Sequence, residues 1–221
     1  MQTIAITTIR FANSLKAVEL PFLRGAMIEA ASLHDASLFH NHTDEGFRYA
    51  YPLIQYKILQ GRAALVGVNQ GANDLLWLRP YLSREHHIGF KNILFEIMSI
   101  ENAEAQIGVS SHTMRYRLNN WLPLNQKNDR LFHSTKDESK RLMLLEGILT
   151  NNIVAFFQAF DYSPSEHIFC SIERRGPIEK VMYKDVQMRA VDVDFITNAL
   201  LPLNIGIGKG TSLGHGIIQT I

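Results

Sequence analysis

The stretch that decides the fold is RYAYPLIQYKILQGRAALVGVNQG, residues 48–71. Two runs of apolar, aromatic and β-branched residues lie on either side of Gln60-Gly61. Residues of these types favour strands, and a glycine can take the positive φ angle that a tight hairpin turn requires. The pattern therefore predicts two antiparallel strands joined at Gln60-Gly61.

The segments around this hairpin extend the pattern in both directions. On its amino-terminal side, MQTIAITTIRF (1–11) predicts a strand, and LPFLRGAMIEAASLHD (20–35) predicts a helix with Pro21 in its first turn. On its carboxy-terminal side, ANDLLWLRPYL (72–82) predicts a short helix and residues 87–110 predict a strand. The first half thus has the order β–α–β–β–α–β, which is typical of a ferredoxin-like unit.

The second half begins with the same pattern of a strand followed by a helix. In HTMRYRLNNWLPL (112–124), apolar residues alternate with arginines, which is the period of a half-buried strand. Thr135 and Glu138 have the spacing of a capping box, which predicts that a long helix over residues 136–160 begins there.

The remaining segments complete a second unit of similar order. Residues 166–195 predict two or three strands that turn at Gly176-Pro177, and a final strand ends the chain. We therefore predict an α+β fold with two tandem ferredoxin-like (RRM-like) units packed together. The predicted boundaries are 1–108 for the N-terminal unit, which holds a candidate histidine site, and 109–221 for the C-terminal unit, which holds a glycine-rich loop.

Composition limits the classes of function. Of the 221 residues, 46% are apolar and 19% are charged, and the net charge is +1. A nucleic-acid interface would need local clusters of cations, because a net charge this small supplies no general attraction for phosphates. The single cysteine, Cys170, excludes an intrachain disulfide and a cysteine-based zinc site. With no leader-like start and no run of about 20 apolar residues, we expect a cytoplasmic protein without a membrane segment.

The glycine-rich stretch GIGKGTSLGHG, residues 206–216, does not fit the known phosphate loops. A P-loop would need a glycine where Leu203 stands, and a dinucleotide fingerprint would need one at Thr211. Dense glycines still offer backbone N–H groups to an anion, and Lys209 adds a cation. The alternative is a turn with a bulged terminal strand.

The second candidate is FHNH, residues 39–42, with two histidines two positions apart. His40 and His42 could bind zinc if His34 and Asp44 completed the ligands. They could also act as general base and general acid in cutting RNA, because histidine titrates near neutral pH. The third alternative is an ordinary polar loop.

Taken together, these features resemble the CRISPR repeat-processing endoribonuclease family, the sixth Cas family, and most of all its b subgroup. The resemblance depends on LRG (23–25), LFHNH (38–42), YPLIQYKI (51–58) and the glycine-rich stretch. Over residues 85–200 it extends only to the order of the elements.

The resemblance implies an endoribonuclease that cuts precursor CRISPR RNA within repeats. Cutting would need no metal or other cofactor and would leave a 2′,3′-cyclic phosphate and a 5′-hydroxyl. His40 and His42 would be the general base and acid, in either assignment, and Tyr49 would orient the scissile phosphate. Relatives also place a lysine in the site; none precedes the histidines here, and Lys57 is the next lysine along the sequence.

The expected partner is CRISPR repeat RNA. Its predicted contacts in the glycine-rich stretch are Gly206, Gly208, Lys209, Gly210, Ser212, Gly214, His215 and Gly216. Arginines on the strands, at 115, 117, 174 and 175, either face solvent or track phosphates. Whether the chain forms a homodimer or joins an interference complex stays open.

Three rival hypotheses remain at this stage. The first is an RNA-binding module of the same fold that does not cut. The second is a metal hydrolase that uses His40, His42 and an acidic residue. The third is a structural protein in which the histidine pair has no role.

Overall fold

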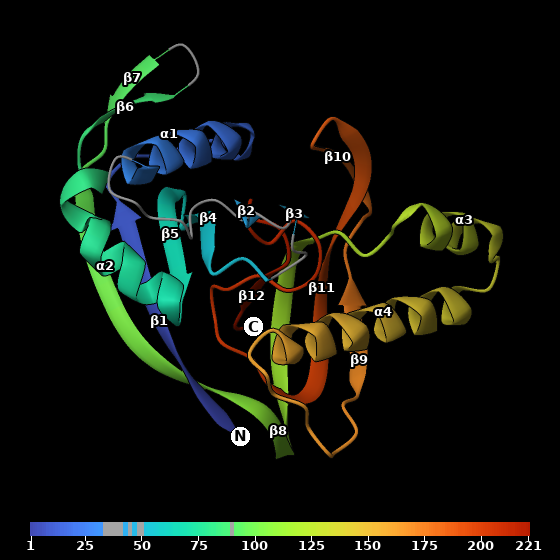
Figure 1. Cartoon of the computed structure of the whole chain (residues 1–221). Coiled ribbons are helices and arrows are strands. Elements are labelled where there is room, and N and C mark those ends of the chain that lie inside the picture. The colour runs from blue at the N-terminus through green and yellow to red at the C-terminus, as the bar shows by residue number, and fades with distance from the viewer. Residues whose placement is uncertain (33–41, 44–45, 48–50, 89–90) are drawn as a thin grey trace. The chain divides into compact units, whose positions relative to one another are not determined.

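Figure 1 shows the computed structural model of the chain, which describes residues 1–32, 42–43, 46–47, 51–88 and 91–221. The chain divides into two compact units. The N-terminal unit comprises Thr3–Ala105 and Ser212–Gly214. The C-terminal unit comprises Met1–Gln2, Gln106–Thr211 and His215–Ile221.

The N-terminal unit is built on an antiparallel hairpin at the edge of its sheet. Its strands are β1 (Gln2–Phe11), β4 (Ile54–Leu59), β5 (Arg62–Val68) and the first part of β8 (Ile97–Trp121). They lie side by side in the order β4-β5-β1-β8. β4 and β5 pair from Ile54↔Gly67 to Leu59↔Arg62, and the turn between them has φ of 52° at Gln60 and 77° at Gly61. The predicted hairpin is confirmed.

Two helices cover one face of this sheet. They are α1 (Leu20–Ser32), which follows the short η1 (Ala17–Glu19), and α2 (Gln70–Leu82) (Figure 1). Their buried side chains, among them Leu23, Met27, Leu75 and Leu78, pack in one cluster with β1, β4 and β5. Two small strand pairs complete the described part of the unit: β2 (His42–Thr43) with β3 (Gly46–Phe47), and β6 (Glu85–Ile88) with β7 (Lys91–Leu94).

The C-terminal unit places a long helix against antiparallel strands. Its elements after β8 are α3 (Gln126–Ser134), α4 (Glu138–Gln158), β9 (Cys170–Arg175), β10 (Glu179–Tyr183), β11 (Val186–Leu200) and β12 (Ile217–Gln219). β11 pairs with β8 on one side and with both β9 and β10 on the other, and β12 pairs with β8. Trp121 at the end of β8 donates a hydrogen bond to Asn152 of α4 at 2.9 Å.

The strand order is the same in both units, which confirms the predicted α+β fold with two ferredoxin-like units. In each unit the third strand lies between the second and the first, and the fourth strand lies beside the first. The C-terminal unit departs from the pattern before its last strand. Residues 201–216, all of them described, form no helix between β11 and β12, and they include the glycine-rich stretch.

The prediction of separate strands over 87–110 and 112–124 was wrong. β6 and β7 form a hairpin of their own, and β8 then continues from Ile97 to Trp121 without a break. The polar residues near position 111 do not end β8, because the partner strand β11 accommodates them by a change in pairing. Its pairing with β8 shifts register between Thr197 and Ala199.

The predicted capping box was also wrong. Asp137 is the N-cap of α4, and its carboxylate accepts hydrogen bonds from the N–H groups of Ser139 at 2.9 Å and Lys140 at 3.4 Å. Thr135 instead ends α3, a helix that the sequence analysis missed, where its hydroxyl donates to the carbonyl of Leu131 at 2.8 Å. Asp137, rather than Thr135, caps α4 because it directly precedes the first helical residue.

Candidate functional site

The predicted catalytic residues lie in or beside the part of the chain that the structure does not describe. His40 and Tyr49 are outside the described residues. His42 begins β2, where its backbone pairs with Phe47 of β3. The roles of these three residues therefore stay predictions, and the site is built from the strand that follows them.

That strand, β4, places its side chains alternately on two faces. Tyr56 lies in the cluster that packs against the helices, whereas Gln55 and Lys57 point to the other face and are fully buried. Just before the strand, the hydroxyl of Tyr51 accepts a hydrogen bond from the amide of Gln55 at 2.7 Å. Burial raises the pKa of Tyr51, so its phenol stays protonated at neutral pH.

Lys57 is a buried amine without a counter-charge in the described structure. Its side chain is 0% exposed, and no described residue forms a hydrogen bond with its Nζ. Burial lowers the pKa of Lys57 well below its ordinary value, because an ammonium ion loses its hydration in the interior. The burial of Lys57 therefore favours its neutral form over its charged form.

The glycine-rich stretch is fixed by backbone hydrogen bonds in each unit. In the N-terminal unit, the N–H of Tyr56 donates to the carbonyl of Ser212 at 2.9 Å. In the C-terminal unit, the N–H of Ile207 donates to the carbonyl of Gly216 at 2.9 Å. Gly216 has a φ of 63°, and a Cβ there would collide with the carbonyl of Ile207. Only glycine fits this crossing of two backbones.

The structure separates the predicted RNA contacts into an exposed tip and a packed base. Gly208 and Lys209 are exposed, and Ser212 is half-buried. The packed residues of the group are Gly206, Gly210, Gly214, His215 and Gly216. Only the tip therefore presents both N–H groups and a cation to solvent, while the base sets its position.

His215 belongs to the packed base. Its Nδ1 lies 3.1 Å from the carbonyl of Asn120, and its ring meets the ring of Tyr183 edge-on at 5.5 Å between centroids. A Cβ on Gly210 would lie only 2.8 Å from this ring, so the glycine makes room for it. Burial lowers the pKa of His215, which favours a neutral imidazole that donates from Nδ1. The packed ring of His215 thus stabilises the glycine-rich stretch.

The arginines of the C-terminal sheet are held in ion pairs. Asp194 on β11 accepts hydrogen bonds from Arg117 on β8 at 2.7 and 3.0 Å and from Arg174 on β9 at 2.6 Å. Arg115 pairs with Glu173 at 2.6 Å. The guanidinium groups of Arg117, and then of Arg174, hold the pKa of Asp194 at about 2, so it is ionised at neutral pH. This face of the sheet is an alternation of charges rather than a bare cationic track.

A hollow beside Lys209 was not predicted. Four further cations line it: Lys127 and Arg130 from α3, Lys180 from β10 and Arg189 from β11. These residues are scattered over more than 60 positions of the sequence, and two of them belong to the helix that the sequence analysis missed. A cluster of this kind gives no local sequence signal, because only the tertiary fold brings its members together.

The described residues form neither a metal site nor a membrane-spanning helix. The described part of the chain contains no group of three or more His, Cys, Asp or Glu residues arranged to hold a metal ion. None of its helices combines the length and the apolar character that crossing a bilayer demands.

Comparison with protein-family models covers both units. A model of the Cas6b N-terminal domain matches residues 2–107, and a model of the Cas6b C-terminal domain matches residues 108–221. A search of curated proteins gave no match.

Solved structures share the fold over the full length of the chain. A crystal structure of Cas6b has 24% identity and a TM-score of 0.85, and it covers 100% of both chains. A crystal structure of the CRISPR RNA processing endoribonuclease Cas6b has 21% identity and a TM-score of 0.77, again over 100% of both chains. Csf5, a CRISPR-Cas type IV Cas6 crRNA endonuclease, has 13% identity and a TM-score of 0.61 over 100% of both chains.

Proposed function

The chain belongs to the Cas6b family, and on that premise we propose that it is an endoribonuclease that cuts precursor CRISPR RNA within each repeat. The observation that carries the proposal is the match of both family domains, which together span residues 2–221. A structure of this fold and length, described as a CRISPR RNA processing endoribonuclease, supports it. The substrate is then repeat RNA, recognised by its phosphates, its shape and its unpaired bases.

The proposed chemistry is attack of a 2′-hydroxyl on the adjacent phosphorus. One of His40 and His42 removes the proton from the 2′-oxygen, which then bonds to phosphorus. The bond to the 5′-oxygen breaks, and the other histidine gives that oxygen a proton. The products are a 2′,3′-cyclic phosphate and a 5′-hydroxyl, so the step needs no metal ion or other cofactor. Tyr49 orients the scissile phosphate.

Negative charge grows on the phosphoryl oxygens during this step and has to be stabilised. Lys57 is poorly placed to supply the positive charge, because it is fully buried and burial disfavours its charged form. The exposed tip of the glycine-rich stretch has the required groups, namely the backbone N–H groups around Gly208 and the ammonium of Lys209. We assign charge stabilisation, or the holding of RNA, to this tip. The proposed setting is the cytoplasm, where the single cysteine stays reduced.

The experiment that tests this function uses a labelled stem-loop from the CRISPR repeats of the host. It is incubated in EDTA with the wild type, with His40→Ala/His42→Ala, and with His87→Ala/His112→Ala. The last variant is the matched control, because it removes two exposed histidines elsewhere. The ends of the products are then mapped.

We expect one cut with a cyclic phosphate in the wild type and in the control, and none in His40→Ala/His42→Ala. Binding without cutting by the wild type would make the protein an RNA-binding module. Cutting that stops in EDTA would make it a metal hydrolase. No affinity for RNA would leave a structural protein.

A further inference from the structure

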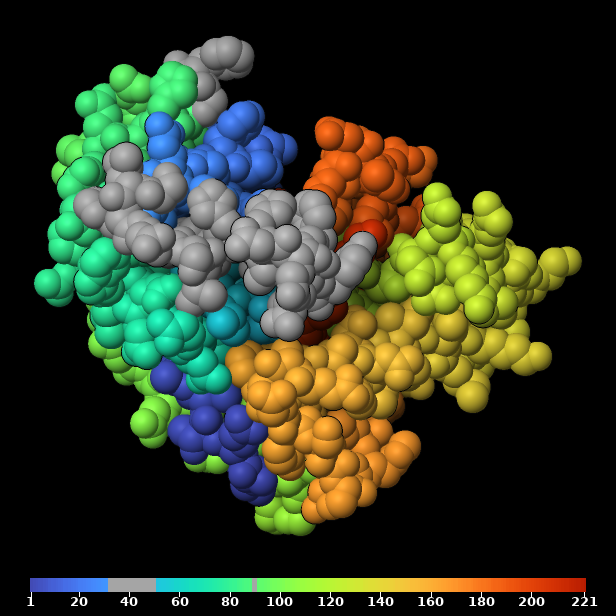
Figure 2. All heavy atoms as spheres, viewed as in Figure 1, coloured from blue at the N-terminus to red at the C-terminus, as the bar shows by residue number. Residues whose placement is uncertain are grey.

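The C-terminal unit has a hollow that was not part of the predicted site. Of the predicted site residues, only Lys209 lines it. Its volume is about 820 Å³, and it lies between the start of α3, the β10–β11 hairpin and Lys209 of the glycine-rich stretch. In Figure 2 it opens between the orange hairpin and the yellow-green helix. All three walls belong to the same unit.

The walls of this hollow concentrate positive charge. Its lining contains five cations, Lys127, Arg130, Lys180, Arg189 and Lys209, and one carboxylate, Asp129. Five positive charges and one negative charge leave a local charge of +4, whereas the whole chain has +1. The rest of the protein is therefore net negative, and the positive hollow attracts anions.

Most of these cations are exposed and have no ion-pair partner among the described residues. Arg189 Nε is held by Asp129 Oδ1 at 2.6 Å, which uses the only carboxylate of the described lining. Lys127, Arg130, Lys180 and Lys209 are exposed, and no described residue forms an ion pair with any of them. They contrast with the arginines of the sheet, whose charges Asp194 and Glu173 already offset.

The arrangement suits an extended polyanion rather than a compact ligand. The cations come from four separate elements, so their charges are spread around an open hollow instead of converging on one point. No aromatic residue is among the described lining residues, so the hollow offers no stacking platform for a base. Asn125, Gln126 and Gln187 add neutral hydrogen-bonding groups of the kind that contact phosphate and ribose oxygens.

We propose that this hollow holds phosphodiester groups of the repeat RNA and so contributes affinity that does not depend on sequence. The inference rests on the proposed function, and it adds a binding site formed by α3, the β10–β11 hairpin and Lys209. Lys127 and Lys180 contact phosphates from opposite walls, and Lys209 joins the hollow to the tip of the glycine-rich stretch.

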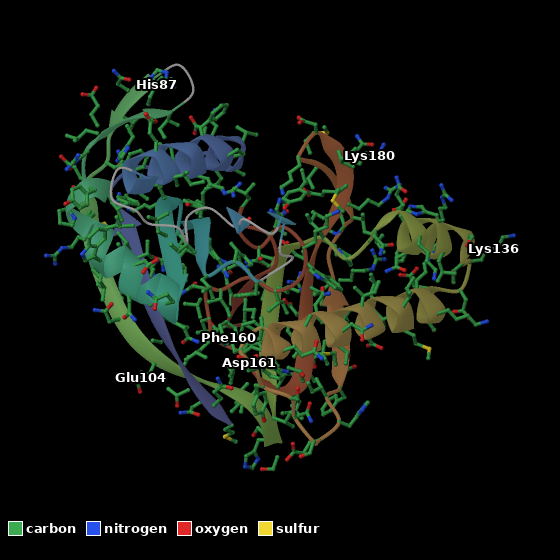
Figure 3. The ribbon with its side chains drawn as sticks, in the orientation of Figure 1. His87, Glu104, Lys136, Phe160, Asp161 and Lys180 are labelled. Atoms are coloured by element: carbon green, nitrogen blue, oxygen red, sulfur yellow. The ribbon has the colours of Figure 1, made fainter. Side chains whose placement is uncertain are left out.

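The test compares two pairs of exposed lysines in the same unit. Lys127→Ala/Lys180→Ala removes one lysine from each wall, whereas Lys136→Ala/Lys140→Ala removes two that do not line the hollow. Figure 3 labels Lys180 on β10 and Lys136 in the turn between α3 and α4. Binding is measured by fluorescence anisotropy between 50 and 300 mM salt, roughly the range in which phosphate contacts are resolved. The probes are a repeat stem-loop with a 2′-deoxy nucleotide at the mapped cut and an unrelated stem-loop of equal length.

We expect the hollow pair to weaken binding on the order of tenfold near 100 mM salt, for both RNAs alike, and to reduce the salt slope by about 1.5. The control pair should change affinity by less than about twofold. The cutting rate should be unchanged in the control pair, which includes no residue of the hollow and no predicted catalytic residue. Thermal melting checks that all three proteins are folded.

Two other outcomes separate this inference from the proposed function. If the wild type binds and cuts the repeat, but the hollow pair has wild-type affinity or only the same loss as the control pair, the hollow does not hold RNA and the nuclease proposal stands. If the wild type neither binds nor cuts, the proposed function falls and the inference falls with it.

Discussion

Asp194 and Lys57 are two ionisable residues within strands. Their surroundings favour the charged form of one and the neutral form of the other. Asp194 is 7% exposed and lies against two guanidinium groups; Lys57 is 0% exposed and has no hydrogen-bond partner among the described residues. The pKa of each is lowered. The lower pKa favours the charged form of Asp194, because Arg117 stabilises the carboxylate, and the neutral form of Lys57, because burial removes water from the ammonium.

This difference shows which cations of the chain can act on RNA. Arg117 and Arg174 are paired with Asp194, and Lys57 is fully buried. Exposed cations such as Lys180 and Lys209 remain available to a ligand. A count of lysines and arginines treats all of these residues alike, and this is why the net charge of the chain says so little about its ligand.

The largest effect on folding is expected from Asp194→Ala. This change leaves Arg117 and Arg174 facing each other with no carboxylate between them, so the free energy of unfolding should fall by roughly 2 kcal/mol. Urea denaturation measures it. The control is Glu173→Ala, which removes the partner of the exposed Arg115 and should cost less than about 1 kcal/mol. Equal losses in the two variants would contradict the contrast.

The pH dependence of stability in Asp194→Ala provides a second test. The pKa of Asp194 is about 2 in the folded protein, below the value of about 3.9 in an unfolded chain. Its contribution is therefore complete above about pH 4 and is lost as the pH falls toward 2. The difference between wild type and Asp194→Ala should shrink over that window.

A smaller effect of opposite sign is expected from Lys57→Met. Methionine keeps the buried aliphatic chain and removes a polar group that no described residue satisfies, so stability should rise by roughly 1 kcal/mol at neutral pH. The exposed Lys91→Met should change stability by less than about 0.5 kcal/mol. A marked loss of stability in Lys57→Met would mean that the amine has a stabilising partner.

The pH window, rather than the sign of the pH effect, distinguishes Lys57 from Asp194, because both folded pKa values are lowered. Because the folded pKa of Lys57 is lowered, the unfolded chain binds one more proton between that pKa and about 10.4. Wild-type stability therefore gains from a rising pH in that range, and Lys57→Met should lose this gain. Unfolding followed from pH 7 to pH 10 measures the difference.

The sequence predicts elements whose cause is local. Gln60-Gly61 sets the β4–β5 hairpin by its own turn chemistry, and the density of glycines marks the loop before β12. The sequence does not predict features that depend on contacts between distant segments. The continuity of β8 depends on a shifted pairing with β11, and α3 has one buried residue, Phe132, to mark it as part of a core.

In the candidate site, too, the sequence predicts local features but not those that depend on tertiary contacts. The glycine-rich stretch is visible in the sequence, but its split into the exposed Gly208-Lys209 and a packed base depends on Tyr56, Ile207 and Asn120. The burial of Lys57 is likewise a tertiary effect. His40, His42 and Tyr49 remain predictions that only chemistry can test.

The most direct measurement of the central claim replaces one atom of the substrate. Once the cut in the repeat is mapped, the nucleotide on its 5′ side is made 2′-deoxy, and the neighbouring nucleotide is made 2′-deoxy in a control RNA. Attack by the 2′-hydroxyl predicts that the wild type binds both RNAs and cuts only the control. Cutting of the first RNA at the same bond would mean that water or another nucleophile attacks, and it would contradict the proposed mechanism.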